Sequence, residues 1–440
     1  MRRAAFLGIL AFSQPLLAAD LLQTYREARS NDAVYASARA ALEAGKEKLP
    51  QGTALLLPTV SGTANTIYND NQILFRNATP GPFVRKFNSN AWSVMLSQPL
   101  VRMQNWEQYK QAEFQVAQAE ASFGQTSQDL IVRVAQAYFD VLASQDSLDF
   151  IQAQKTAISE QLDQAKRNFE VGTATITDTH EAQARFDLAT SQEIAAQNDL
   201  EFKKRVVQQL IGKFPAAFVP LKPSAQLNPP QPNAMEPWVE SAERQNFAVR
   251  IQEAGLEIAS REVRRNKAGH LPTLDLVGTY GETGASNNIL TGFGNDTRGA
   301  TVGLQLSLPL YAGGGISSRV REAVANMEKA RQDLENARRS AALSSRQSYL
   351  GVTNGMAQVR ALEQALVSSQ SALDSNKLGY EVGVRINIDV LNAQQQLYST
   401  KRDLSRARYD TLLNGLKLKA AAGSLSEDDV VAVNTLLGPD

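Results

Sequence analysis

The chain has 440 residues, with 45 basic and 45 acidic residues, two histidines and no cysteine. The lack of cysteine excludes disulfides, thiol catalysis, thiolate metal sites and the cysteine acylation that anchors bacterial lipoproteins. The balanced charge gives no net field to attract nucleic acid. The few histidines and scattered carboxylates form no catalytic constellation, so we expect neither an enzyme nor a cofactor.

The first segment has the pattern of a secretory signal. Two arginines precede an apolar run from Ala4 to Leu17, and Ala18-Ala19 offers a small-residue cleavage point, so residues 1–19 are predicted to be a signal peptide. Its removal leaves 43 basic and 45 acidic residues, a net charge of −2. No later apolar run approaches the ~18 to 20 residues of a membrane helix, so a form of this chain that spans a membrane would be a barrel.

The next segments predict a helix over about 20–49 and then two strands. Trp92, Val94 and Leu96 alternate with smaller polar or flexible side chains, a period of 2 that is typical of a strand. A weaker partner strand is predicted at 58–68, and the polar stretch 69–90 between them reads as an extracellular loop. Each strand is expected to have the ~9 to 11 residues that cross a bilayer when tilted.

A long helix is predicted from about residue 103 to 169, which is ~100 Å at 1.5 Å per residue. No proline lies between Pro99 and Pro215, so nothing breaks this helix. Its apolar residues are spaced alternately 4 and 3 apart, interrupted by Ser144 and Lys155, as in a coiled-coil seam of period 3.5. The members of this seam are Leu130, Val134, Ala137, Val141, Leu148, Ile151, Ile158, Leu162, Ala165 and Phe169.

A turn follows the long helix. Gly172 stands where a helix ends with a left-handed residue, and Asp178, with Glu181 three places on, forms an N-cap signature for a helix over 178–211. The sequence therefore predicts a helical hairpin whose turn lies at the far end of the long helices.

The second half repeats the first. The decapeptide Phe169–Asp178 returns as Tyr380–Asp389, 211 positions later, and Gly383 takes the place of Gly172. The corresponding helices are predicted at 238–268 and 389–422, the strands at 272–283 and Val302–Leu308, and the loop at 284–298. We therefore divide the chain into two repeats, 20–212 and 238–434, with a proline-rich linker at 213–237 and a short tail at 435–440.

Four strands are too few to close a barrel. An open four-stranded sheet with an apolar outer face would leave two membrane-exposed edges with unpaired backbone groups. Several chains must therefore pool their strands.

These features together resemble the TolC family of outer-membrane channel-tunnels. The resemblance covers about residues 20–434 and rests on the signal, the two repeats and the Leu-Pro-Thr strand openings. It also rests on Ser307–Gly314 and on the second-repeat segment YEVGVRINIDVLNAQQQLYSTKRDLSRARYD. It implies a mainly α fold with a membrane β-barrel: long coiled-coil helices form a periplasmic α-barrel, and four strands per chain contribute to a twelve-stranded barrel of a homotrimer.

The resemblance also implies a function and a site. The expected function is the exit channel of a tripartite export system in the outer membrane of a Gram-negative bacterium. The expected partners are outer-membrane lipid, a periplasmic adaptor and an inner-membrane pump of ABC or RND type. Family members close the periplasmic end with a network at the hairpin turns, and the matching positions are Thr177, Asp178, Tyr380, Arg385 and Asp389. Arg385 and Tyr380 are expected to act on Asp178 and Thr177 of adjoining hairpins. A second acidic ring of the family matches Asn392, which reduces the cation binding expected at the entrance.

One alternative stays open at this point: a structural or adhesive surface protein, with a trimeric coiled-coil stalk on a barrel anchor. The internal repeat and the hairpin turns disfavour it, because stalks run in one direction. The sequence leaves open whether the cargo is protein, as in type I secretion, or drugs.

Overall fold

The computed structural model describes residues 19–438 except 75, 77–81, 216 and 289–291. The chain divides into two compact units, and each draws on both halves of the sequence. The first combines the described residues up to Ala40 with Ser122–Val249 and the segment from Ala337 onward; the second combines Ala41–Ala121 with Arg250–Asn336. Apart from Ala19, the expected signal peptide lies outside the described residues.

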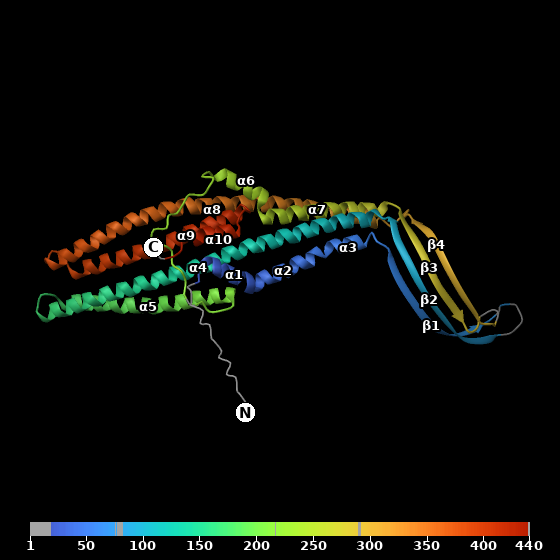
Figure 1. The fold of residues 1–440 in the computed structure, drawn as a ribbon, viewed down its shortest axis with the longest axis horizontal. Helices are drawn as coiled ribbons and strands as arrows, with labels where there is room; N and C mark the ends of the chain where they lie inside the picture. Colours follow the sequence, from blue (N-terminus) through green and yellow to red (C-terminus); the bar gives the residue numbers. More distant parts are fainter. Residues whose placement is uncertain (1–18, 75, 77–81, 216, 289–291, 439–440) are drawn as a thin grey trace, which may run out of the picture. The chain divides into compact units, whose positions relative to one another are not determined.

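Two helical hairpins have their turns in the first unit, and their long helices begin in the second unit. Helix α4 (Met103–Glu170) turns back into α5 (Ile176–Ile211), and α8 (Gly315–Glu381) turns back into α9 (Asn387–Ala421). In each hairpin the two helices lie side by side (Figure 1). The bounds lie within two residues of the helices predicted at 103–169, 178–211 and 389–422.

The predicted seam of α4 is buried along most of its length. Leu130, Val134 and Val141 belong to the main apolar cluster, and Ile158, Leu162 and Ala165 form a second cluster with α5. The two interruptions of the seam make polar contacts to α5: the hydroxyl of Ser144 donates to Asp199 at 2.6 Å, and Lys155 pairs with Glu193 at 2.8 Å.

The end of the seam departs from the prediction. Phe169 is 44% exposed, because the hairpin turn follows at once and the chain supplies little apolar surface there to cover the ring.

The helix predicted over 20–49 is three helices: α1 (Leu21–Asn31), α2 (Ala33–Lys46) and α3 (Lys48–Ala54). The first break comes at Asp32, whose backbone is extended and whose carboxylate accepts a hydrogen bond from the Tyr35 amide at 2.7 Å. The same carboxylate binds Arg133 of α4 through two hydrogen bonds of 3.0 and 3.1 Å. An ion pair to another helix therefore fixes where α1 ends.

The helix predicted over 238–268 is also divided. It consists of α6 (Met235–Gln245), α7 (Phe247–Lys267) and a 3₁₀ turn, η1 (Ala268–His270). Asn246 separates α6 from α7, because its side chain accepts from the Ala248 amide at 2.9 Å and donates to the Ala421 carbonyl at 2.9 Å. A further helix, α10 (Glu427–Asn434), lies in the stretch after α9.

The second unit holds one antiparallel sheet in the order β1-β2-β3-β4. The strands are β1 (Thr59–Ile73), β2 (Phe83–Val101), β3 (Thr273–Ala285) and β4 (Asn295–Ser307). With 13 to 19 residues they are longer than predicted, and much of the stretches predicted as loops at 69–90 and 284–298 is strand. Polar residues continue the ladder there because backbone pairing does not require apolar side chains.

The pairing register places apolar side chains on one face of the sheet. Val60 pairs with Leu96, Leu96 with Gly278, and Gly278 with Val302, and paired residues share a face. We call this the apolar face; its large members include Val60, Trp92, Val94, Leu96, Leu274, Leu276, Tyr280, Val302, Leu304 and Leu306. On the opposite face the hydroxyls of Thr63 and Ser93 share a hydrogen bond of 2.9 Å.

Within the described part of the chain, no helix combines the length and the apolar character that crossing a membrane requires.

Candidate gate at the ends of the two helical hairpins

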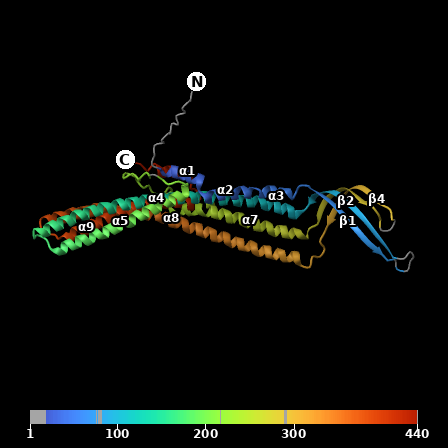
Figure 2. The ribbon, with the colours of Figure 1, turned by 90° about the horizontal axis from the view of Figure 1, so that it is seen from below.

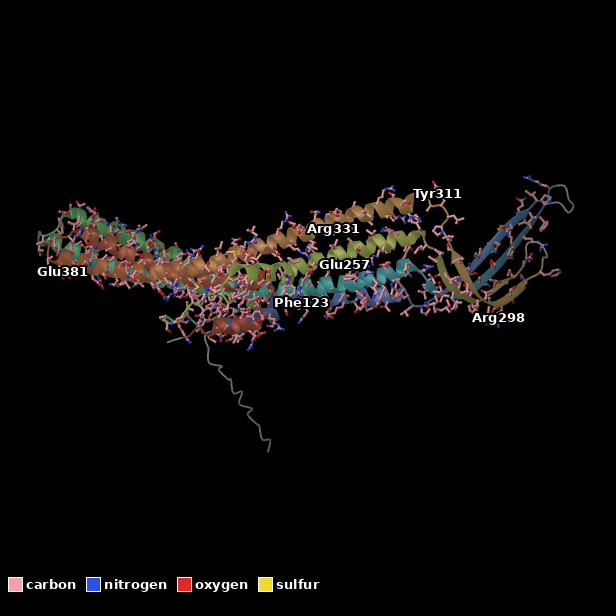
Figure 3. All side chains as sticks on the ribbon, turned by 90° about the horizontal axis from the view of Figure 1, so that it is seen from above. Phe123, Glu257, Arg298, Tyr311, Arg331 and Glu381 are labelled. Atoms are coloured by element: carbon pink, nitrogen blue, oxygen red, sulfur yellow. The ribbon has the colours of Figure 1, made fainter. Side chains whose placement is uncertain are left out.

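The two hairpin turns have the same backbone geometry. Gly172 and Gly383 have φ values of 75° and 78°, which favour glycine because a side chain is strained there. Thr173 donates its amide to the Asn168 carbonyl at 2.8 Å, and Val384 donates in the same way to Gly379 at 2.9 Å. These bonds satisfy the carbonyls that a helix end leaves unpaired. Figure 3 shows Glu381, the last residue of α8, at its turn.

The start of α5 is closed by a capping box. The Asp178 amide donates to the Thr175 hydroxyl at 3.3 Å, and the Asp178 carboxylate accepts from the Thr175 amide at 2.9 Å and from its hydroxyl at 2.8 Å. The prediction that Asp178 is the N-cap is therefore wrong. Thr175 has the extended backbone of an N-cap, so the N-cap lies three residues before the predicted one and Asp178 occupies the third position of the helix.

The start of α9 lacks this cap. Ile386 stands at the N-cap position, where the repeat offset aligns it with Thr175, and its side chain offers no acceptor. The carboxylate of Asp389 is therefore free to pair with Arg385, at 3.7 Å. One substitution between the repeats thus changes the role of the acidic residue, from a cap in α5 to an ion-pair partner in α9.

Three contacts hold the hairpin ends together within one chain. The side-chain amide of Asn168 in α4 donates to the Tyr380 hydroxyl of α8 at 3.1 Å. Leu391 of α9 is buried in the apolar cluster of α4 and α5. Arg185 of α5 donates to two amide oxygens of α9, those of Gln395 at 2.6 Å and Asn392 at 3.0 Å. Figure 2 shows α4, α5 and α9 gathered at this end.

The predicted site residues lie at the hairpin ends, and within one chain most of them are paired as follows. Asp178 is bound to Thr175, Arg385 to Asp389, and Tyr380 to Asn168. Thr177 is exposed. The expected contacts of Arg385 and Tyr380 with Asp178 and Thr177 join adjoining hairpins, which different copies of the chain would supply.

Sequence reasoning missed Arg185 and Asn168. Neither lies within the repeated decapeptide, and the residue that the repeat offset aligns with Arg185 is Gln396, so the repeat gives no signal for a cation at this position. Asn168 precedes the decapeptide by one residue. Only the packing of α5 against α9 and of α4 against α8 brings these side chains to their partners.

As far as the structure describes them, the hairpin ends carry polar side chains without a metal site. Among the described residues no cluster of three or more histidines, aspartates or glutamates is placed to hold a metal ion. Asn387 and Gln394 of α9 are each only 1% exposed. Both polar atoms of the Asn387 amide, and the Gln394 carbonyl oxygen, lack a hydrogen-bond partner in the described part of the chain. Such buried, unpaired atoms lower the stability of the packed arrangement, which therefore depends on the contacts around it.

A family model and two related proteins match nearly the whole chain. A family model described as outer membrane efflux protein matches residues 24–213 and 238–424. The outer membrane protein TolC of Vibrio cholerae is 34% identical over 432 residues, which cover 98% of this chain and 96% of that protein. The alkaline protease secretion protein AprF of Pseudomonas aeruginosa is 33% identical over 438 residues, covering 98% and 90%.

The fold has solved counterparts. The crystal structure of the Campylobacter jejuni CmeC outer membrane channel matches with a TM-score of 0.79, covering 99% of this chain and 96% of that one. Its sequence identity is 16%, so this likeness concerns the fold alone.

Proposed function

The chain belongs to the outer membrane efflux protein family and is an outer-membrane export channel, and from this premise we propose that three copies assemble into the exit duct of a tripartite export system. In this assembly the four strands of each copy join a common barrel of twelve strands. The duct receives cargo from an inner-membrane pump through a periplasmic adaptor. The hairpin ends form its periplasmic gate.

The sheet carries this proposal. β1 and β4 end the sheet in the described chain, so each presents one row of backbone groups to a further strand. On β4 the apolar side chains of Val302, Leu304 and Leu306 are 80%, 66% and 69% exposed. Exposed apolar residues on one face suit lipid, and free edges within lipid must be paired. Pairing β4 of one copy with β1 of the next satisfies both needs.

The gate assignment rests on charge and position. Thr177, Asp178, Tyr380, Arg385 and Asp389 all belong to the hairpin ends, where they can meet their counterparts in neighbouring copies. The carboxylate of Asp389 is 35% exposed and the guanidinium of Arg385 is 60% exposed, so neither is sequestered in the single chain. Arg385 can therefore exchange Asp389 for a partner on an adjoining hairpin as the gate closes.

The cargo follows from the pump rather than from the channel. A relative of this chain is named for the secretion of alkaline protease, which supports protein as one cargo. Crosslinking in cells followed by copurification identifies the adaptor and shows whether the pump is of ABC or RND type.

The assembly is tested by mass and conductance. In mild detergent the purified protein should have the mass of three chains, and in planar bilayers it should form a channel of low resting conductance. A monodisperse monomer with an intact strand signal would contradict the pooled barrel. A trimer without conductance under any condition would instead favour the stalk-like surface protein.

A further inference from the structure

Arg185 joins the two hairpins of one chain by a contact that the gate assignment does not include. Its guanidinium lies on α5, and it donates one N–H group to the Gln395 side-chain oxygen at 2.6 Å and another to the Asn392 oxygen at 3.0 Å. Residues 392 and 395 are three apart on α9 and therefore share one face of that helix. A guanidinium presents its donors as a rigid fork, which fits two acceptors spaced in this way.

We propose that Arg185 is a positioning residue that latches α5 to α9 in the closed channel and stabilises that state in addition to the hairpin-end gate. This inference rests on the proposed gate. Opening the periplasmic end requires the hairpins to separate, and Arg185 is a side chain of α5 whose hydrogen bonds cross to α9.

An apolar contact next to the acceptors of Arg185 also joins the two hairpins. Leu391 of α9, next to Asn392, is buried in the apolar cluster of α4 and α5 and so holds α9 against the other hairpin. The same stretch of α9 buries Asn387 and Gln394, whose unpaired polar atoms lower the stability of the packing. The Arg185 contacts add to the packing of Leu391 in holding the hairpins together.

The acceptors are amides, which sets the strength of the latch. Hydrogen bonds from a guanidinium to neutral oxygens are weaker than those to a carboxylate, so this contact can break during gating. A carboxylate at position 392 would turn it into an ion pair with Arg185. Asn392→Asp is therefore expected to tighten the closed state, because Arg185 neutralises the new charge before it can add to cation binding at the entrance.

The test measures single-channel opening of the full-length protein in planar bilayers. Arg185→Ala should raise the open probability about tenfold, and Asn392→Leu, which removes an acceptor from the other side, should raise it in the same direction. The open probability of Arg185→Lys should lie between those of the wild type and Arg185→Ala, because an ammonium group cannot donate to both oxygens in the geometry of a guanidinium. The matched control is Arg205→Ala: Arg205 also lies on α5, but its hydrogen bonds go to Glu201 and Gln208 of the same helix.

A double substitution separates a latch from a loss of structure. Asn392→Asp alone should lower the open probability, whereas in the Arg185→Ala background it should no longer do so and should instead increase block by a multivalent cation such as hexamminecobalt. If Asn392→Asp changes opening equally in both backgrounds, the two residues do not act on each other and the latch is refuted.

Parallel recordings of Arg385→Ser distinguish the latch from the gate. If Arg385→Ser opens the channel while Arg185→Ala and Asn392→Leu behave like Arg205→Ala, the latch is wrong and the gate stands. If Arg185→Ala opens the channel but Arg385→Ser and Tyr380→Phe do not, the latch stands and the hairpin-end assignment is wrong. If none of them opens it, both fail.

Discussion

Each ion pair of Arg385 is weak, and the pair that we propose it makes with an adjoining hairpin gains its effect from repetition. In one chain Arg385 and Asp389 are 3.7 Å apart and partly hydrated, and a pair near the surface of this kind contributes ~0.2 to 1 kcal/mol. Three copies meet at one gate in the proposed trimer. One substitution therefore removes three interactions, up to ~3 kcal/mol in total, and shifts an open–closed equilibrium by about a hundredfold.

We accordingly expect Arg385→Ser to raise single-channel conductance, and Tyr380→Phe, which removes the hydroxyl bound by Asn168, to raise it further in combination. Asp389→Ala should instead weaken block by multivalent cations from the periplasmic side and affect closure less. The matched control is Arg406→Ser, because Arg406 pairs with Asp410 of α9 at the same spacing and the same 3.7 Å. If Arg385→Ser and Tyr380→Phe both keep the wild-type conductance, the gate assignment is wrong and the decapeptide serves only as a helical turn.

Asp32 shows a different use of an ion pair, one that fixes the chain path. Burial by itself raises the pKa of this carboxyl, but hydrogen bonds from Arg133 and from the Tyr35 amide outweigh burial and hold the pKa below its usual value. A lowered pKa in the folded state means that the stabilisation is present above the pKa of the unfolded chain. It is lost as the pH falls through the folded value.

Arg133→Met should therefore destabilise the first unit by about 1.5 to 3 kcal/mol at pH 7, the contribution of hydrogen bonds to a charged group. The difference from the wild type should narrow as the pH is lowered from 7 to 3, because the wild type then loses the same contribution by protonation. Unfolding followed by helical circular dichroism in detergent measures both effects. Arg205→Met is the control, and a gap that stays constant with pH would show that Asp32 does not carry the effect.

At the scale of the element, the starts of α5 and α9 show how one residue redirects a repeated motif. Thr175 gives α5 a capping box that engages Asp178, whereas Ile386 leaves Asp389 to Arg385. A hydroxyl at position 386 would complete the box in α9. The carboxylate of Asp389 would then accept from the backbone amide of residue 386, in competition with Arg385.

Ile386→Thr is thus expected to stabilise α9 by about 0.5 to 2 kcal/mol and, at the same time, to lower the resting conductance, because Arg385 then exchanges Asp389 more readily for its partner on the adjoining hairpin. Thermal unfolding and conductance are measured on the same preparation. Ile386→Val is the control, since it changes the side-chain shape without adding an acceptor. A variant that is more stable but equally tight would mean that Asp389 can serve both partners.

At the scale of the whole molecule, the sheet determines how the chain meets the membrane. Leu304 and Gln305 are neighbours on β4 and point to opposite faces, Leu304 to the apolar face. In a pooled barrel Leu304 faces lipid and Gln305 faces the interior. A charged residue on the lipid face costs about 2 to 4 kcal/mol near the middle of the bilayer, and less near its surfaces.

Leu304→Arg should therefore lower the fraction of protein recovered as membrane-inserted trimer, while Gln305→Arg, the same change one residue on, should assemble normally and alter only ion selectivity. Gel separation of unboiled outer-membrane fractions measures assembly. Equal loss in both variants would mean that the register does not define a lipid face.

The sequence by itself determined the elements that depend on local pattern. The 3.5-residue seam, the proline-free stretch and the paired glycines predicted the bounds of α4, α5 and α9 to within two residues. They could do so because the spacing of apolar side chains along the sequence indicates a helix. Alternation with period 2 likewise located β2 and β4, and their weaker partners β1 and β3 were predicted beside them. The strand ends were missed because the ladder continues through polar residues that have no pattern of their own.

Only the tertiary structure decided features that depend on residues far apart in sequence. The break at Asp32 requires Arg133, the pairing of β2 with β3 joins the two halves of the chain, and the contacts of Arg185 and Asn168 require the two hairpins to pack together. None of these contacts is indicated by a regular spacing in the sequence, because the packing of the helices and strands determines which residues meet. The sequence therefore located the hairpin ends, and the fold decided which side chains hold them together.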